Sequence, residues 1–253
     1  MRIGILLSVR EKATRFPGKV LKPLGPFSIT EHLLLRLLEV SNATEVILAT
    51  SHDARDEALV QIAKDVGTKY FQGSADDKLV RYRDAAHTFS LDFLVIVDGD
   101  DPFCSVEHLE SMIKFVEQDT PDYIQYQGLP IGATGFGVCT KALERLCEKK
   151  NQHNTEVWQH LFYNDTDFRS VFLREERPLF NREDIRMTLD YPEDYEFFVR
   201  VANDLLEQGK SLKFANIMGF LEANPEVVGI NRGLSEKYEE HLARSRSQNA
   251  SRV

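Results

Sequence analysis

Three aspartates follow a short apolar run in the segment FLVIVDGDDPF, residues 93–103. An apolar run of this length predicts a buried strand, so Asp98, Asp100 and Asp101 stand together at its end. Carboxylates held this close raise one another's pKa unless a cation lies among them. Mg²⁺ binds one or two carboxylates together with phosphate oxygens. A turn or cap role is the alternative, and it suits Asp101 before Pro102 better than all three.

Cations gather in the loop after the first apolar run, at Arg10, Lys12, Arg15, Lys19 and Lys22. Such a cluster suits a polyanion such as a triphosphate. A solvated basic loop is the plainer alternative for cations considered alone. The segment RFPGK lacks the GxxxxGK[ST] spacing, so it is not a Walker loop.

A further aspartate, Asp190, lies in RMTLDYPEDYEF, where a strand is expected to end and a helix to begin. Alone it is most simply a helix cap. Together with Asp100 it could complete a divalent metal site from the far side.

Apolar runs and helical patterns alternate over the first 120 residues. We expect strands at 2–9, 45–50, 69–73 and 93–99, and helices at 28–40, 52–67, 76–89 and 105–118. This alternation implies a parallel sheet with helices on both faces. Ligands of such sheets bind beyond the carboxyl ends of the strands. The basic loop and the acidic cluster both follow strands, so they should crowd one edge of the sheet.

Beyond residue 120 the alternation loosens, and glycines, a proline and aromatic residues in 122–140 predict a small antiparallel excursion. We expect helices at 140–150, 154–163 and 190–209, a strand at 168–175, and a chain end from 234 that begins helical. The predicted class is α/β, one Rossmann-like domain over residues 1–240 with a mainly parallel sheet and a polar tail at 241–253.

The net charge of −9, from 31 basic and 40 acidic residues, argues against a nucleic-acid-binding surface. No apolar run is long enough for a transmembrane helix, and the N-terminus is a poor signal peptide. The three cysteines lack CxxC spacing and predict reduced thiols. We therefore expect a cytoplasmic protein that is not inserted in a membrane.

Five segments together resemble one enzyme family. The opening RIGILLSVREKATRFPGKVLKPLG resembles that of the cytidylyltransferases that make CMP-activated sugar acids, where an arginine precedes Pro-Gly-Lys. The segments ILATS, FQGSADDKLVRY, VDGDDPF and MTLDYPEDYEF resemble later blocks in the same order. The resemblance covers residues 2 to about 200 and is strongest to the spore-coat-polysaccharide branch, with CMP-Kdo synthetases and acylneuraminate cytidylyltransferases as relatives. Order and spacing make it specific, since no block is specific alone.

The resemblance implies a nucleotide-diphospho-sugar transferase fold, CTP as substrate and Mg²⁺ as cofactor. Asp100 and Asp190 match the family's metal-binding aspartates, and Arg15 joins the catalytic cations. The positions that match nucleotide contacts are Ser8, Val9, Arg10, Lys19, Ser74 and Arg81. Val9 replaces the usual alanine, and Asp98 replaces a residue that is often glutamine. Asp98 could therefore contact the nucleotide or add a metal ligand.

The implied reaction is nucleotidyl transfer, in which an acceptor oxygen attacks the α-phosphate of CTP and pyrophosphate leaves. Arg10, Arg15, Lys19 and Asp100 would be the catalytic residues, acting by positioning and charge neutralisation. The nucleotide-binding part would span about 1–120, and the acceptor-binding and dimerisation part about 121–185, with a homodimer formed through 125–165.

The acceptor implied by the resemblance is a small anion, a sugar 2-keto acid related to Kdo or a nonulosonate. A phosphonate or a polyol phosphate is the runner-up. A sugar acid needs a cation for its carboxylate, and the candidates are Arg169, Arg174, Arg177 and Arg182.

Two other functions compete with this interpretation. Asp98-Gly99-Asp100 is a literal DxD, which predicts a metal-dependent nucleotide-sugar glycosyltransferase, although such an enzyme has no need of the basic first loop. A non-catalytic nucleotide-binding module is the other, but Asp100 and Asp190 argue against it. His153, Glu156 and His160 could share one helical face as metal ligands, although an acceptor pocket or dimer contact suits that spacing better. Trp158 is expected to serve packing.

Overall fold

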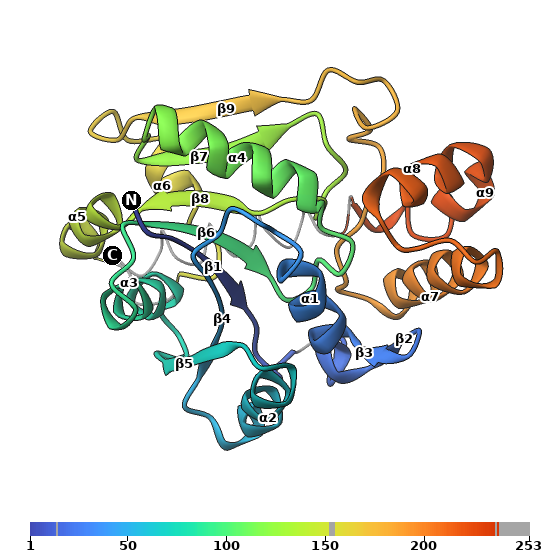
Figure 1. Ribbon diagram of the computed structural model, residues 1–253, viewed down its shortest axis with the longest axis horizontal. Helices are drawn as coiled ribbons and strands as arrows, with labels where there is room; N and C mark the ends of the chain where they lie inside the picture. Colours follow the sequence, from blue (N-terminus) through green and yellow to red (C-terminus); the bar gives the residue numbers. More distant parts are fainter. Residues whose placement is uncertain (14, 152–154, 236, 238–253) are drawn as a thin grey trace.

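The computed structural model describes residues 1–13, 15–151, 155–235 and 237, and Figure 1 shows a central sheet flanked by helices. Within these residues the main sheet has seven strands in the order β5-β4-β1-β6-β8-β7-β9. The strands are β1 (Ile3–Ser8), β4 (Glu45–Ser51), β5 (Lys69–Gly73), β6 (Phe93–Asp98), β7 (Tyr123–Gln127), β8 (Phe136–Cys139) and β9 (Ser170–Arg174). A separate antiparallel pair is formed by β2 (Pro23–Leu24) and β3 (Phe27–Ser28).

The strand directions place most carboxyl ends at one edge of the main sheet. β1 pairs in parallel with β4 and β6, and β4 pairs in parallel with β5. β8 is antiparallel to both β6 and β7, whereas β7 and β9 are parallel to each other. β7 and β9 therefore point the same way as β6, as the arrows in Figure 1 show. The predicted parallel sheet and its antiparallel excursion are both confirmed.

Helices cover both faces of the sheet, as predicted. The α-helices are α1 (Ile29–Leu37), α2 (Glu57–Val66), α3 (Lys78–Thr88), α4 (Val106–Gln118), α5 (Thr140–Lys149), α6 (His160–Tyr163), α7 (Pro192–Glu207), α8 (Phe214–Ala223) and α9 (Pro225–Val228). In the part of the chain that the structure describes, two single 3₁₀ turns are η1 (Lys19–Leu21) and η2 (Ala54–Asp56). The α/β class implied by the alternating sequence pattern is thus observed.

Alternate residues of the central strands enter two separate hydrophobic cores. Ile5 and Leu7 of β1 pack with α1, α2, α4, α7 and α8, whereas Leu6 packs with α3 and α5 on the opposite face. All six residues of β1 are buried. A strand buried on both faces explains why its sequence is an unbroken apolar run rather than an alternating one.

One predicted helix is largely wrong. Of the expected helix 154–163 only the single turn α6, His160–Tyr163, forms. Trp158 lies 1% exposed against the rings of Tyr82 and Tyr123, and this packing holds the chain before α6 in an irregular path. Glu156 is therefore not on a helix, and His153 lies outside the described residues. The packing role predicted for Trp158 is confirmed.

Local hydrogen bonding and backbone conformation set the ends of α1 and α2. Ser28 caps α1 by accepting from the Glu31 N–H at 3.2 Å, and Gly67 ends α2 with φ 84°. The three cysteines are unpaired. Among the described helices, none has the length and apolar character that crossing a membrane requires.

Candidate active site

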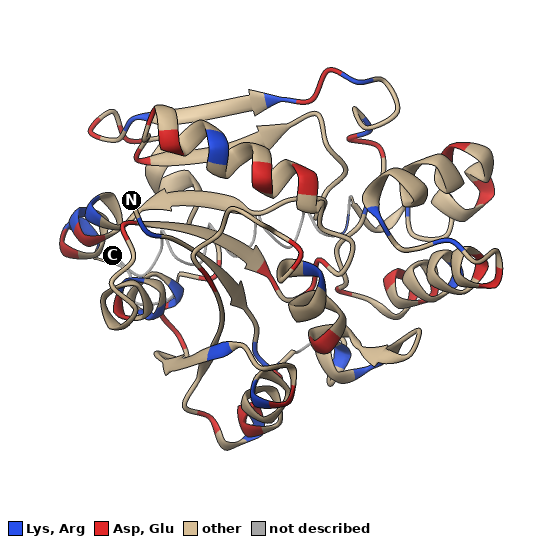
Figure 2. Cartoon of the chain, in the orientation of Figure 1, with Lys and Arg blue, Asp and Glu red and all other residues tan. Residues whose placement is uncertain are grey.

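The basic loop and the acidic cluster begin side by side, because β1 and β6 are neighbours. Ser8 and Asp98, the last residues of these strands, are partners in the register. Figure 2 shows acidic residues at the tip of β6, at the edge toward which β1 also points. The expected convergence of the two loops on one edge of the sheet is therefore observed.

The Lys19 ammonium links the two aspartates expected to bind metal. Its Nζ lies 2.9 Å from Asp100 Oδ2 and 3.1 Å from Asp190 Oδ1, and it also donates to the Leu189 carbonyl. Burial alone would lower the pKa of Lys19, but the two carboxylates outweigh it and raise the pKa. In this arrangement Lys19 occupies the place between Asp100 and Asp190.

Asp190 is held by cations on both carboxylate oxygens. Arg15 and Lys19 donate to Oδ1, and Arg186 Nη2 donates to Oδ2 at 3.0 Å. Burial favours the protonated form, but Lys19 and then Arg15 outweigh it and lower the pKa of Asp190 to about 2. Asp190 is thus a buried, charged carboxylate, and both of its oxygens accept hydrogen bonds from cationic side chains.

Tyr191, not Asp190, is the N-cap residue of α7, and Asp194 in the first turn completes a capping box with it. Asp194 Oδ2 accepts from the Asp190 and Tyr191 N–H groups at 2.9 and 3.0 Å. Arg186 Nε and Asn231 Nδ2 each donate to its Oδ1 at 2.9 Å. The simple cap role considered for Asp190 is therefore wrong. Asp194 ties the Asp190 backbone to α7 and orients Arg186 toward the same site.

The three aspartates of the β6 loop form a compact oxygen cluster. Asp98, Asp100 and Asp101 each bring one carboxylate oxygen within 4.8 Å of the others. Burial, followed by repulsion from the neighbouring aspartates, raises the pKa of Asp101 well above its usual range. Burial also raises the pKa of Asp98. Hard oxygen ligands that repel one another are the donor set a divalent cation fits, so these residues fit Mg²⁺.

Asp101 is a turn residue but not a helix cap. Its N–H donates to the Asp98 carbonyl at 3.1 Å, and its own carbonyl accepts from the Cys104 N–H at 3.1 Å. The residue before α4 is Ser105. The Asp101 carboxylate instead faces the other two aspartates, which corrects the cap role considered for it.

Ser8, at the end of β1, and Arg81, on α3, form a buried polar group. Ser8 Oγ lies 2.6 Å from the Tyr82 hydroxyl and accepts from Arg81 Nη2 at 3.4 Å. Arg81, which is fully buried, also donates to the Ser74 carbonyl at 2.8 Å. The predicted nucleotide contacts Ser8, Ser74 and Arg81 therefore meet.

The backbone around Val9 is already engaged. The Val9 N–H donates to the Ala49 carbonyl at 3.2 Å, and the Ser8 carbonyl accepts from the Gly99 N–H at 2.8 Å. A Cβ at Gly99 would lie 2.5 Å from Val9 Cγ2, so Gly99 allows the close approach of the two loops. The Val9 N–H and the Ser8 carbonyl are therefore both hydrogen-bonded within the sheet edge.

Lys78 and Glu156, which the sequence interpretation did not assign to the site, connect Arg10 to Asp98. Lys78 Nζ lies 3.4 Å from Asp98 Oδ1 and 3.2 Å from Glu156 Oε2. Arg10 also pairs with Glu156 and donates to the Ala75 carbonyl. The partners of Lys78 and Glu156 are distant in sequence, so only the fold could place these two residues here. Arg186 lies within RMTLDYPEDYEF, and its spacing of four and eight residues from Asp190 and Asp194 is the signal that could have identified it.

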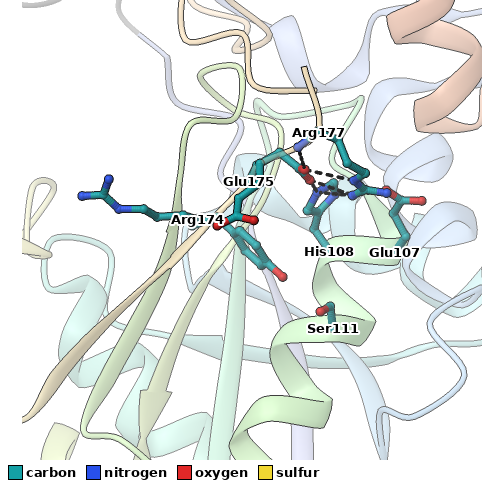
Figure 3. A pocket seen from close by; sticks show the side chains of 8 residues that line it. Glu107, His108, Ser111, Arg174, Glu175 and Arg177 are labelled. Atoms are coloured by element: carbon teal, nitrogen blue, oxygen red, sulfur yellow. Dashed lines mark hydrogen bonds and ion pairs between the residues drawn. The ribbon is translucent and has the colours of Figure 1, made fainter. Parts of the chain in front are cut away.

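A pocket of about 440 Å³ opens near the start of α4 and the ends of β7 and β9. Figure 3 shows Glu175 and Arg177 directed at His108, with Arg174 pointing away from them. His108 Nε2 lies 2.6 Å from Glu175 Oε2, and Arg177 donates to Glu175 and Glu107. This pocket lies on the same edge of the sheet as Asp98, because β9 is parallel to β6 through β7.

The four arginines considered for the acceptor do not meet at the aspartate cluster. Arg169 pairs with Asp119, and Arg182 pairs with Asp184 and Glu222. Arg174 and Arg177 line the pocket instead. Within the described residues, Arg15 and Arg186 are the arginines that pair with Asp190.

Comparisons with known proteins agree on one family. A family model described as cytidylyltransferase matches residues 3–216. The chain is 25% identical over 233 residues to the spore coat polysaccharide biosynthesis protein SpsF of Bacillus subtilis, covering 89% of this chain and 96% of that one. It is 30% identical over 117 residues to a 3-deoxy-manno-octulosonate cytidylyltransferase of Pseudoalteromonas atlantica, 44% of each chain. The solved structure of a cytidylyltransferase from Leptospira borgpetersenii has a TM-score of 0.81 and 26% identity, covering 90% of this chain and 97% of that one.

Proposed function

Since the chain belongs to the cytidylyltransferase family, we propose that it transfers the cytidylyl group of CTP to a sugar acid related to 3-deoxy-manno-octulosonate and releases pyrophosphate. Family membership makes the chain a nucleotidyltransferase. The CMP-activated sugar acid would serve the synthesis of a surface polysaccharide, the process named for the similar Bacillus protein. The glycosyltransferase and the non-catalytic module are set aside by the family match.

One observation carries the proposal. The cations of the first loop, Arg15 and Lys19, meet carboxylates of two other loops, Asp100 and Asp190, at the carboxyl edge of a parallel sheet. This is where such sheets bind nucleotides. Alternating cations and carboxylates suit a metal-bound triphosphate, because the cations can hold phosphate oxygens while the carboxylates hold the metal.

Mg²⁺ would be held by Asp100, with Asp98 and Asp101 beside it, and when bound would neutralise charge on the phosphates. Asp190 can join Asp100 as a ligand only when Lys19 and Arg15, now bonded to its Oδ1, turn to the nucleotide. Lys19 and Arg15 would then hold the phosphates that leave as pyrophosphate and offset their growing charge.

No covalent enzyme intermediate is needed in this reaction. The acceptor hydroxyl loses its proton to solvent as its oxygen forms a bond to the α-phosphorus of CTP, and the bond from that phosphorus to the pyrophosphate oxygen breaks. The chain's contribution is to align the two groups and to stabilise charge. The residues proposed to act on the triphosphate are Arg10, Arg15, Lys19 and Asp100.

Pyrophosphate release tests the proposal directly. The purified chain is incubated with CTP and Mg²⁺ and with 3-deoxy-manno-octulosonate, its 8-amino-3,8-dideoxy analogue, or a polyol phosphate in separate reactions. We expect release with CTP and a sugar acid, and formation of the CMP–sugar acid by mass spectrometry. UTP in place of CTP is the control. Release with the polyol phosphate alone would contradict the proposed acceptor, and equal release with UTP would contradict cytidylyl specificity.

A further inference from the structure

We propose that Lys78 joins Arg10 in an anion subsite for the phosphate groups of the nucleotide, and that Glu156 fills this subsite until the nucleotide displaces it. This inference rests on the proposed nucleotidyl transfer, since it concerns the same sheet edge. It adds a phosphate-binding residue, Lys78, and an internal competitor, Glu156, to that site.

The geometry is that of a carboxylate held between two cations. Glu156 Oε1 pairs with Arg10, and Glu156 Oε2 lies 3.2 Å from Lys78 Nζ. One carboxylate thus bridges the end of β1 and the start of α3. A phosphate group offers the same two-oxygen bridge with more negative charge.

The exposures indicate which of the three groups is replaceable. The side chains of Arg10 and Lys78 are 18% and 16% exposed, whereas that of Glu156 is 47% exposed. Here the anion lies on the solvent side of two shielded cations, which is the side from which a ligand would arrive. Partly buried cations need such a counter-charge.

Buried residues on either side of Glu156 hold its backbone in place, and this backbone position directs the carboxylate toward the two cations. Thr155 is fully buried, and its hydroxyl donates to Asp77 Oδ1 at 2.9 Å and accepts from the Leu79 N–H at 3.2 Å. Trp158 is buried two residues later. Turning of the Glu156 side chain would therefore release Arg10 and Lys78 without a shift of Thr155 or Trp158.

A phosphate suits this subsite better than the carboxylate of an acceptor. Arg81 lies close enough to Arg10 that their like charges help lower the pKa of Arg10, after burial as the main cause. Three cations near one point favour a ligand with more than one negative charge. The carboxylates that now pair with Arg10 and Lys78 are those of Glu156 and Asp98.

Removal of the Glu156 charge tests the displacement. In titration calorimetry with Mg²⁺, we expect Glu156→Gln to bind both CTP and inorganic pyrophosphate about threefold to tenfold more tightly than the wild type. The gain follows because a site that is blocked for part of the time shows an affinity reduced by the open fraction. Lys78→Gln should bind both ligands more weakly, and Glu156→Gln should gain less in that background.

Asp76→Asn is the matched control. Asp76 is exposed, adjoins the same helix start and changes the net charge equally. Its charge acts on Arg10 at longer range, but no ion pair joins it to Arg10 or Lys78 in the described part of the chain. A gain equal to that of Glu156→Gln would show that long-range charge alone is responsible, and would overturn the proposal. Unchanged or weaker binding in Glu156→Gln would also overturn it, as would a lack of pyrophosphate binding by both proteins.

The inference and the proposed function can fail separately. If pyrophosphate binds and Glu156→Gln tightens it, but the wild type binds no CTP, the subsite stands and the cytidylyl transfer does not. If CTP is turned over and Glu156→Gln leaves both affinities unchanged, the reverse holds. Thermal unfolding of Lys78→Gln checks that its loss of binding is not a loss of fold, because Lys78 also pairs with Asp98.

Discussion

Charges on single side chains determine how this sheet edge is organised. Lys19 bonds to carboxylates from the β6 loop and from the segment before α7, and Arg15 and Arg186 complete the set around Asp190. Each cation neutralises a carboxylate that would otherwise be costly to bury. Since the same cations are proposed to hold phosphate, ligand binding would exchange partners within a network that already exists.

Asp100→Ala should abolish turnover without unfolding the chain. Asp100 is 29% exposed and accepts one bond from Lys19, so its loss costs little stability, whereas the proposed metal loses its main ligand. We expect pyrophosphate release to fall by about 10²-fold to 10³-fold, the scale of removing a preorganised electrostatic group. A near-normal rate, with an unchanged melting temperature, would contradict the role of Asp100.

Lys19→Ala should weaken the binding of CTP. The substitution removes an ammonium that reaches both Asp100 and Asp190, and we expect at least about a tenfold rise in Kd by calorimetry, typical of a lost charge-assisted contact. Lys12→Ala is the control, because Lys12 is exposed in the same loop. Equal effects of the two substitutions would mean that only the net charge of the loop matters.

Some residues of the candidate site could be placed from the sequence pattern, and others could not. Asp100 and Lys19 follow apolar strands, so the alternating pattern alone placed them at one edge. Lys78 and Glu156 could not be foreseen, because their pairing depends on how residue 155 docks on α3. The pairing of Arg186 with Asp194 likewise depends on the turn before α7.

Loops between elements decide how closely the charged groups approach. Gly132, in the loop between β7 and β8, has φ 82°, and a Cβ there would lie 2.4 Å from the Met187 carbonyl and 2.7 Å from Asp101 Oδ1. This contact brings together the antiparallel excursion, the segment before Asp190 and the acidic cluster. The excursion is thus part of the scaffold of the site.

Gly132→Ala should therefore damage both stability and activity. The left-handed backbone conformation alone costs about 1–3 kcal/mol for a residue with a side chain, and the clash adds to this. Gly209→Ala is the matched control, because Gly209 has φ 67° but nothing within 4 Å of its added Cβ. In urea unfolding we expect Gly132→Ala to lose more stability than Gly209→Ala. Equal losses would contradict the packing role.

Element prediction succeeded where apolar periodicity is strong. The runs VILAT and FLVIV gave β4 and β6 within one residue of the observed bounds. The two-residue strands β2 and β3 are too short to carry a period, and the apolar segment FANIMGFLEA of α8 was not assigned. The region before α6 failed because tertiary packing of Trp158 overrides local helical preference.

At the scale of the whole molecule, an ionic group of His108, Glu175 and Arg177 joins α4 to the segment that follows β9. Burial opposes the charge of Glu175, but hydrogen bonds from Arg177 and His108 outweigh it and lower the pKa of Glu175 to about 2. Burial lowers the pKa of His108 in spite of Glu175. Both groups therefore bind fewer protons in the folded chain than in the unfolded chain at acid pH.

Stability should fall in acid in two stages. Below about pH 6.5 the unfolded chain takes up the His108 proton first, and from about pH 4.3 downward the Glu175 contribution is lost as the pH falls toward about 2. Glu175→Gln should destabilise the chain by about 1–3 kcal/mol at pH 7 and by much less near pH 2–3. Urea unfolding at pH 7, 5 and 3 measures this difference. A difference that is constant with pH would contradict the ionic role.

We further predict a homodimer that uses residues from 125–165. Tyr163, within this range, is 40% exposed and its ring lies 6.2 Å from that of Phe172, itself 38% exposed on the edge strand β9. Exposed aromatic pairs are typical of interfaces. Light scattering should give twice the mass of one chain, and Tyr163→Lys with Phe172→Lys should give a monomer. A monomeric wild type would refute this.

The central place of β1 and β6 has a consequence for how the protein loses activity on heating. Their backbone amides lie inside the main sheet, between β4 and β8, so they should exchange with deuterium only through opening of most of the structure. Ser8 and Asp98 end these strands, and the loops that carry the proposed catalytic residues start from them. Thermal inactivation should therefore coincide with global unfolding, with no earlier phase in which a folded but inactive chain accumulates.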